Sequence, residues 1–172
     1  REVTGIIAPG LGEPVRLETF ELPAPAEGEV IVKMAASGVC HSDLHYIDGH
    51  LGDEFPFLLG HEGSGFVEEV GPGVNSPIVG DFVVLSYRAP CYRCHPCRVG
   101  QTDHCQEPQT ADTKPELHDG TPLTPALGLG TFATHCVVAA DQAIPISPDC
   151  PPPQASLLGC CVSTGIGSVF RT

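Results

Sequence analysis

The sequence predicts a mainly β, barrel-like domain with short helices and one longer helix near its C-terminal end. Among its 172 residues are 20 glycines and 18 prolines, and both residue types interrupt helices. Short apolar segments bounded by turn residues recur along the chain, which is typical of strands. A chain of this length suits one domain, which would bury about 70% of its unfolded surface on folding.

Four segments are predicted to be strands. Residues 29–36 form an apolar run bounded by turn residues, and residues 65–70 alternate between apolar and polar until the turn signal Gly71-Pro72-Gly73. Residues 81–85 and residues 130–140 follow the same pattern. Together they indicate a β-rich body.

The segments between these strands predict two helices and a long loop. Residues 40–46 are rich in helix-capping residue types and suit about two helical turns. Residues 107–126 are polar and aperiodic, so we expect a functional or mobile loop there. Residues 154–170 are small and apolar, which favours a buried helix despite its glycines.

The composition excludes several classes of partner. Eight Lys and Arg against 21 Asp and Glu give a formal net charge of −13, spread along the chain. Nucleic acids and anionic membranes need a basic face, so neither is expected as a partner. No run approaches 18 apolar residues, and the N-terminus lacks an apolar signal region. We therefore expect a cytoplasmic protein without a transmembrane helix.

Four cysteines predict a structural zinc lobe through the spacing C-x2-C-x2-C-x7-C, namely Cys91, Cys94, Cys97 and Cys105. Thiolates are soft ligands, and four of them make the usual closed, tetrahedral structural zinc site. The alternative is a disulfide knot of the kind found in small secreted domains. An odd total of nine cysteines and the missing secretory signal favour zinc.

Three further segments carry candidate metal ligands. They contain Cys40, the pair His61 and Glu62, and the pair Cys160 and Cys161. Taken singly, a histidine or a buried cysteine is more often a core residue than a ligand. One histidine and two cysteines together leave a fourth position open, which is the pattern of catalytic zinc sites.

These motifs resemble the catalytic domain of zinc-dependent medium-chain alcohol dehydrogenases, which has a GroES-like, partly open β-barrel. The resemblance covers essentially the whole chain and rests on motifs in the family's order: Gly38-Val-Cys40-His-Ser-Asp43, Leu59-Gly-His61-Glu-x-x-Gly65, Val70-Gly-Pro-Gly-Val74, Gly80-Asp81, the four-cysteine lobe, and Gly159-Cys160-x-x-Ser-Thr-Gly165. It implies two zinc ions per chain, one catalytic and one structural.

The resemblance implies a catalytic zinc held by Cys40, His61 and Cys160. Cys161 stands where the family usually has glycine, so it is the less favoured ligand. Glu62 corresponds to a residue behind the metal that is at most a transient ligand. Asp43 resembles the carboxylate that orients the ligand histidine, and it also suits a helix cap.

The resemblance further implies a route for the proton released from an alcohol. Ser42 matches the hydroxyl beside the substrate oxygen, and His45 matches the relay histidine at the end of the route, although a solvated surface histidine is the alternative. His41 matches a position that touches the coenzyme pyrophosphate. Tyr87 matches an aromatic residue of the substrate pocket, or it is a core tyrosine.

The resemblance also implies a domain layout in which residues 1–153 form the GroES-like catalytic domain, including the lobe at residues 88–106. Residues 154–172 form the helix that carries the third catalytic ligand and leads to a doubly wound NAD-binding domain absent from this sequence. The expected coenzyme is NAD(P), with NAD favoured, and the complete enzyme is expected to be a homodimer or homotetramer.

The implied reaction is oxidation of a small-molecule alcohol, or of a thiol adduct of formaldehyde. Tyr87-Arg88-Ala89 and residues 118–128 resemble the mycothiol-dependent formaldehyde dehydrogenase branch, a relative of the glutathione-dependent one. Ser163-Thr164, Pro90 and Cys161 depart from that branch. The alternative function is a non-catalytic zinc-binding module that acts through protein contacts.

Overall fold

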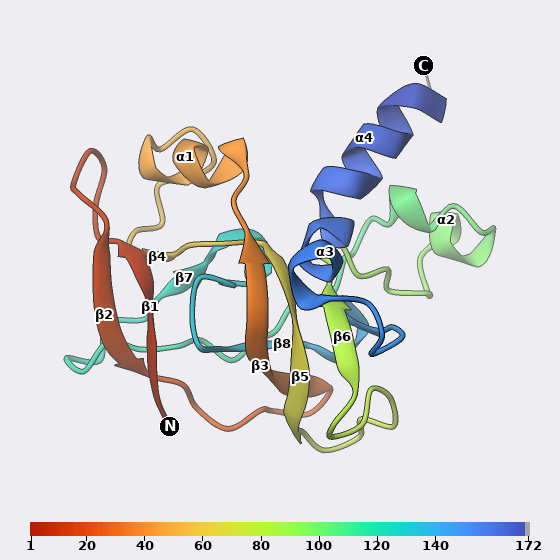
Figure 1. Cartoon of the computed structure of the whole chain (residues 1–172), viewed down its shortest axis with the longest axis horizontal. Coiled ribbons are helices and arrows are strands. Elements are labelled where there is room, and N and C mark those ends of the chain that lie inside the picture. Colours follow the sequence, from red (N-terminus) through yellow and green to blue (C-terminus); the bar gives the residue numbers. More distant parts are fainter. Residues whose placement is uncertain (171–172) are drawn as a thin grey trace.

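The chain folds around two β-sheets, with its helices gathered at one end (Figure 1). A computed structural model describes residues 1–170. The strands are β1 Glu2–Ala8, β2 Arg16–Glu21, β3 Glu29–Gly38, β4 Phe57–Leu58, β5 Glu62–Val70, β6 Phe82–Leu85, β7 Thr124–Pro125, β8 His135–Ala139 and β9 Ala143–Pro145.

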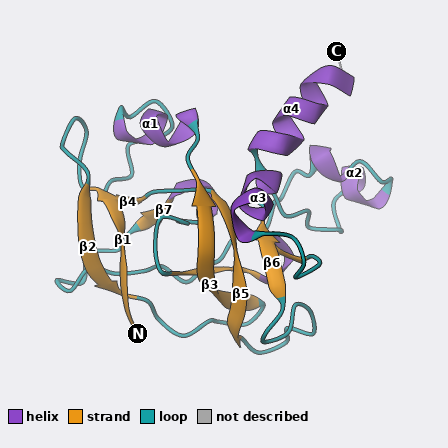
Figure 2. Cartoon of the chain, viewed as in Figure 1, coloured by secondary structure: helices purple, strands orange, loops and turns teal. Residues whose placement is uncertain are grey.

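The helices are short and lie between or after the strands (Figure 2). The α-helices are α1 His41–Ile47, α2 His95–Arg98, α3 Pro152–Ser156 and α4 Cys161–Phe170. The 3-10 helices are η1 Thr102–His104, η2 Ala126–Gly128, η3 Ala140–Gln142 and η4 Leu157–Gly159. Of the helices in the described part of the chain, none is long and apolar enough to cross a membrane.

Strand pairing is antiparallel throughout, apart from the short parallel pair of β4 and β7. One sheet has the order β2-β1-β4-β7, and the other has the order β8-β3-β5-β6-β9. The long strand β3 lies between β8 and β5, so both of its edges are paired. Its register against β5 places Gly38 opposite Glu62, where both strands reach the helical end.

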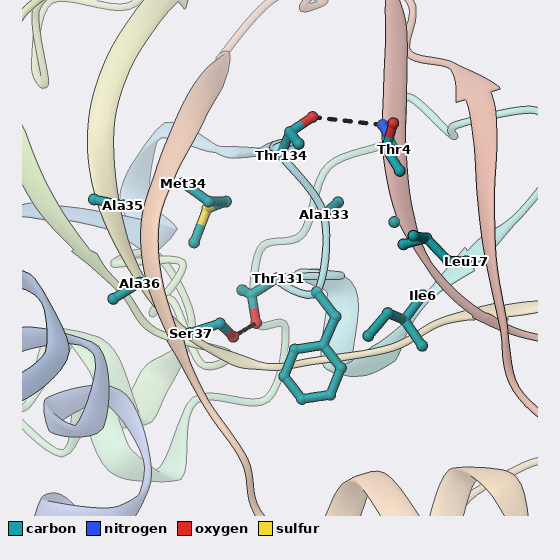
Figure 3. Close-up of a pocket in the computed structure, with 12 residues that line it drawn as sticks. Thr4, Ile6, Leu17, Met34, Ala35, Ala36, Ser37, Thr131, Ala133 and Thr134 are labelled. Carbon is teal, nitrogen blue, oxygen red and sulfur yellow. Dashed lines mark hydrogen bonds between the residues drawn. The ribbon is translucent and has the colours of Figure 1, made fainter.

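Residues 131–134 join the two sheets into a partly open barrel. The Ile6 amide donates to the Phe132 carbonyl at 2.8 Å, and the Met34 amide donates to the Thr134 carbonyl at 3.0 Å. This seam lines a groove of about 410 Å³ on the side of the barrel (Figure 3). Within it, the Ser37 and Thr131 hydroxyl oxygens lie 2.8 Å apart.

Two groups of buried apolar side chains fill the barrel. One lies between β1 and β3 and includes Ile7, Phe20 and Ile31, and the other lies between β3, β5 and β6 and includes Val32 and Leu85. Complete burial of an aliphatic or aromatic side chain contributes about 1.5–3 kcal/mol. The core therefore holds together the two strands, β3 and β5, that lead to the helical end.

The predicted mainly β class is confirmed, and the predicted strands correspond to β3, β5, β6 and β8. Five strands went unpredicted, among them β1, whose apolar run Gly5 interrupts, and β2, in which charged side chains dominate. The other three, β4, β7 and β9, have only two or three residues each, and β7 lies within the predicted loop at residues 107–126. The predicted single helix at residues 154–170 is wrong, since it breaks into α3, η4 and α4. It was also expected to be buried, yet none of the side chains of α4 is. Residues 171–172, at the end of the predicted C-terminal segment 154–172, lie outside the described residues.

Candidate metal centres

Four candidate ligands from three separate segments meet at the helical end of the barrel. Donor atoms of Cys40, His61, Glu62 and Cys160 all lie within 4.8 Å of one another. Cys40 follows β3 and immediately precedes α1, while His61 and Glu62 stand at the start of β5. Cys160 lies between η4 and α4, where its backbone leaves the helical region with φ −137° and ψ −68°.

Two glycines allow these segments to approach closely. A Cβ atom on Gly38 would lie 2.3 Å from a carboxylate oxygen of Glu62, and one on Gly159 would lie 2.2 Å from the Leu85 carbonyl oxygen. Real Cβ contacts are never this short, so a larger residue at either position would displace Glu62 or the segment that carries Cys160. Close backbone approach is a common reason for glycine next to a site.

Asp43 fixes two of the ligand side chains. One carboxylate oxygen lies 3.1 Å from Nδ1 of His61, and the other accepts the Cys40 amide at 2.9 Å. Burial lowers the pKa of His61, but the bond to Asp43 and its charge outweigh burial and raise it. A proton held at Nδ1 leaves the Nε2 lone pair directed into the cluster, as in metal-bound histidines.

The pKa values of the two cysteines in the cluster favour a bound cation. Burial raises the pKa of Cys40, but hydrogen bonding with Ser42 and the nearby His61 imidazole outweigh burial and lower the pKa. Burial and the neighbouring Cys40 and Glu62 raise the pKa of Cys160 to about 11. The two thiols can therefore both ionise near neutral pH only if a positive charge, such as a metal ion, lies between them.

The unpaired atoms at this cluster fit a zinc ion. Nε2 of His61 and both carboxylate oxygens of Glu62 are buried and have no hydrogen-bond partner. Each such atom costs about 1–3 kcal/mol unless something binds it. Two sulfurs on tetrahedral zinc, with bonds of about 2.3 Å, lie about 3.8 Å apart, which the observed 4.8 Å limit accommodates. Two cysteines and a histidine leave one position for an exchangeable oxygen.

A cleft of about 420 Å³ gives access to this cluster. Cys40, Glu62 and Cys160 line it, together with His41 and residues of the first turn of α4. Cys161 also lines the cleft, but it is exposed and lies outside the group of converging donor atoms. An organic molecule of modest size therefore has room beside the metal position.

The four-cysteine lobe forms the second cluster. The donor atoms of its cysteines lie within 4.8 Å of one another, and none of the nine cysteines forms a disulfide. The Cys94 amide donates to the Cys91 sulfur at 3.4 Å, and the Cys91 amide donates to the Cys105 sulfur at 3.3 Å. Tyr92 adopts a positive φ of 54° between them, which tightens the loop.

The pKa values of the cysteines in the lobe also favour binding of a cation. Hydrogen bonds from the backbone at Gln106 and Cys97 lower the pKa of Cys94 to about 6. Burial and the neighbouring thiols raise the pKa of Cys97 to about 12. Four sulfurs at this spacing cannot all ionise unless a metal ion compensates their charge, so the residues fit a closed zinc site.

Helix α1 carries the predicted relay residues. Ser42 Oγ lies 3.7 Å from the Cys40 sulfur. His45 Nε2 lies 3.2 Å from Nδ1 of His41, and His45 Nδ1 lies 3.3 Å from Nδ1 of His50. No hydrogen bond joins Ser42 to His45 among the described residues. No role for His50 could be predicted from the sequence, because its contact with His45 depends on the turn that follows α1.

Tyr87 lies in the loop after β6 and is partly exposed, so it is not a core tyrosine. It lines a pocket of about 250 Å³ together with Arg88, Thr102 and Ser163. The pocket also includes Gly159, the residue before Cys160.

Comparisons with known proteins agree with this geometry. The alcohol dehydrogenase GroES-like domain family matches residues 26–148. An S-(hydroxymethyl)glutathione dehydrogenase of Aspergillus oryzae is 36% identical over 96% of this chain and 46% of its own length. The chain thus spans about half the length of the curated relatives it matches.

Two solved structures are similar to this chain in fold as well as in sequence. The alcohol dehydrogenase zinc-binding domain protein of Burkholderia ambifaria is 33% identical with a TM-score of 0.89, over 99% of this chain and 49% of that one. Benzyl alcohol dehydrogenase of Acinetobacter calcoaceticus is 29% identical with a TM-score of 0.85, over 99% and 48%. The predicted resemblance is confirmed, and the chain belongs to the alcohol dehydrogenase GroES-like domain family.

Proposed function

We propose that the protein containing this chain is a zinc-dependent dehydrogenase that oxidises an alcohol, or the thiol adduct of formaldehyde, with NAD(P) as hydride acceptor. The convergence of Cys40, His61 and Cys160, with Nε2 of His61 buried and unpartnered, carries the proposal. A cluster that served only to hold the fold would have no need of an open cleft beside it.

The residues of the chain have distinct tasks in this proposal. Cys40, His61 and Cys160 hold a catalytic zinc, and Asp43 keeps the imidazole of His61 in the tautomer that can bind it. Glu62 supplies a negative charge behind the metal and is at most a transient ligand. When bound, zinc acts as a Lewis acid on the substrate oxygen and favours loss of the hydroxyl proton.

Ser42 and His45 are proposed to move that proton to solvent. Ser42 Oγ stands 3.7 Å from the Cys40 sulfur, next to the metal position, while His45 stands near the surface of the same helix. Since no hydrogen bond joins them, the proton must cross a bridging hydroxyl group or water. General acid and base groups placed in this way contribute about 10²–10⁴-fold to rate.

The proposal also assigns residues of this chain to the coenzyme and to the substrate. His41 lines the cleft and is proposed to contact the coenzyme pyrophosphate, while Tyr87 lines the substrate side. NAD is favoured over NADP. The relatives named S-(hydroxymethyl)glutathione dehydrogenase support a thiol adduct of formaldehyde as substrate. The named benzyl alcohol dehydrogenase supports a simple alcohol instead.

The layout and the setting of the enzyme are proposals as well. Residues 1–153 are the catalytic domain, with a structural zinc in the lobe at residues 88–106, and residues 154–172 lead toward a coenzyme domain. We propose a homodimer or homotetramer that works in the cytoplasm on a small molecule.

The full-length protein provides the test. NAD+ or NADP+ reduction is measured with ethanol, with benzyl alcohol, and with formaldehyde plus glutathione or mycothiol. Ser42→Ala should lower turnover about 10²–10⁴-fold because it removes a proton-transfer group, while the zinc content stays unchanged. Ser147→Ala, which changes an exposed hydroxyl that donates to the Asp149 carboxylate and lies outside both clusters and their clefts, is the matched control and should keep most of the turnover.

Absence of NAD(P) reduction with every substrate, in a protein that holds both zinc ions, would favour the non-catalytic zinc module. Unchanged turnover in Ser42→Ala would remove Ser42 from the proton route without touching the metal assignment.

A further inference from the structure

Three histidines form a continuous row along α1 and the turn after it. His41 and His50 are exposed and His45 is half-buried between them. His45 presents Nε2 to His41 and Nδ1 to His50, so its two neighbours face different nitrogens. Imidazoles whose nitrogens face each other at such distances share either a proton or a metal ion.

The backbone fixes the position of His50. After α1, Gly49 adopts a φ of 71°, which is in the left-handed region that glycine tolerates. The chain therefore turns back, and the His50 amide donates to the His45 carbonyl at 2.8 Å. The His45 and His50 rings are thus held next to each other before any ion binds, which lowers the entropic cost of chelation.

The spacing of this pair matches a shared metal ion. Two imidazoles on one tetrahedral zinc, with bonds of about 2.0–2.1 Å, have donor nitrogens about 3.3 Å and ring centres about 5.2 Å apart. The Nδ1 atoms of His45 and His50 lie 3.3 Å apart, and their ring centres lie 5.4 Å apart. The ring centres of His41 and His45 lie only 4.6 Å apart, which is too close for that geometry.

We propose that His45 and His50 form a surface chelate for one divalent transition metal ion, separate from the two cysteine-containing clusters. Imidazole nitrogen suits zinc, nickel, cobalt and copper, whereas magnesium and calcium prefer oxygen ligands. Waters complete the coordination, because no other His, Cys, Asp or Glu donor converges on this pair among the described residues.

A metal ion at this chelate has a consequence that rests on the proposed function. An ion bound to His45 takes the nitrogen that otherwise exchanges protons with the surroundings, so His45 can no longer accept the proton that arrives through Ser42. Excess zinc would therefore inhibit the dehydrogenase from a position outside its catalytic zinc site.

Metal binding is tested on the zinc-loaded protein by calorimetric titration with Ni²⁺ at fixed pH. The wild type should bind one further ion, and His45→Gln or His50→Gln should weaken that binding about tenfold or more, because each removes one of two ligands. His41→Gln and His118→Gln should bind nickel like the wild type. His118 is an exposed histidine whose ring contacts Thr19 instead of another histidine.

The results of these experiments test the metal site and the proposed reaction independently. No further nickel ion, or equal binding by His50→Gln and the wild type, would overturn the site. Equal weakening by His41→Gln and His50→Gln would overturn the choice of pair. In a kinetic assay of the full-length enzyme, His50→Gln should raise the zinc concentration needed for half-inhibition about tenfold. A protein that binds nickel as described yet has no dehydrogenase activity would overturn the proposed function alone.

Discussion

Asp43 connects two of the candidate metal ligands through a single carboxylate. It accepts the Cys40 amide with one oxygen and contacts Nδ1 of His61 with the other. Its two expected roles, a helix cap and a histidine-orienting carboxylate, are therefore combined in one geometry. Any change at this position acts on the start of α1 and on the ligand ring together.

Asp43→Asn should weaken zinc binding at the Cys40, His61 and Cys160 cluster about 10–100-fold, because the amide holds the imidazole tautomer less firmly than a carboxylate. The measurement is competition with a chromogenic chelator, and the zinc of the four-cysteine lobe serves as internal reference. Asp48→Asn, at the exposed end of the same helix, is the matched control. Equal affinities in the two variants would contradict the role given to Asp43.

Glu29 is a buried carboxylate that stabilises the fold far from the metal sites. Its oxygens accept the backbone amides of Ala26, Asp112 and Thr113 at 2.7–2.9 Å. Burial raises the pKa of this carboxyl, but the bonds from Thr113, Ala26 and Asp112 outweigh burial and hold it below the ordinary 4.5. These bonds also attach the long loop predicted at residues 107–126 to the barrel.

Glu29→Gln should lower the free energy of unfolding by about 1–3 kcal/mol at pH 7, since a neutral amide replaces a charged acceptor. Because the folded pKa is depressed, the stabilisation is present above about pH 4.5 and is lost as the pH falls through the folded value. Urea unfolding between pH 3 and pH 7 measures this, with the exposed Glu27→Gln as control. A gap between the Glu29→Gln variant and wild type that persists undiminished at pH 3 would contradict it.

At the scale of elements, the four-cysteine lobe contains only the short α2 and η1, so we expect metal ligation to supply most of its order. Cys94→Ser should remove one zinc per chain and lower the melting temperature, because one of four ligands is lost. Zinc analysis and calorimetry measure both effects, and Cys150→Ser, outside both clusters, is the control. If Cys94→Ser retains two zinc ions per chain, the four-cysteine assignment fails.

At the scale of elements, some features could be predicted from the sequence and others could not. Spacing in the sequence predicted the lobe, because four cysteines within 15 positions lie in one short loop and can readily converge on one another. The break of the C-terminal helix at Cys160 could not be predicted, since it depends on a backbone turn between η4 and α4. The pairing of His45 with His50 could not be predicted either, because it also depends on a backbone turn, the positive φ of Gly49.

At the scale of the whole molecule, the sequence predicted the mainly β class and the strands that carry the site. Strands β1 and β2 were missed because their stabilisation comes from pairing with each other and from the core beneath Phe20, not from their own composition. The meeting of Cys40, His61 and Cys160 followed from the family resemblance, and no spacing in the sequence would have required it. Tertiary packing decides such contacts.

The lobe has a further consequence for the lifetime of the protein. Arg88, Arg93 and Arg98 are three of only eight basic side chains in the chain, and they lie in or beside the loop that the four sulfurs close. A zinc ion on the four sulfurs would hold this backbone tightly, and its loss would be expected to open the loop and offer cleavage sites to proteases that cut after basic residues. Metal loading would thereby be coupled to degradation, so that unmetallated copies would be the first to be removed.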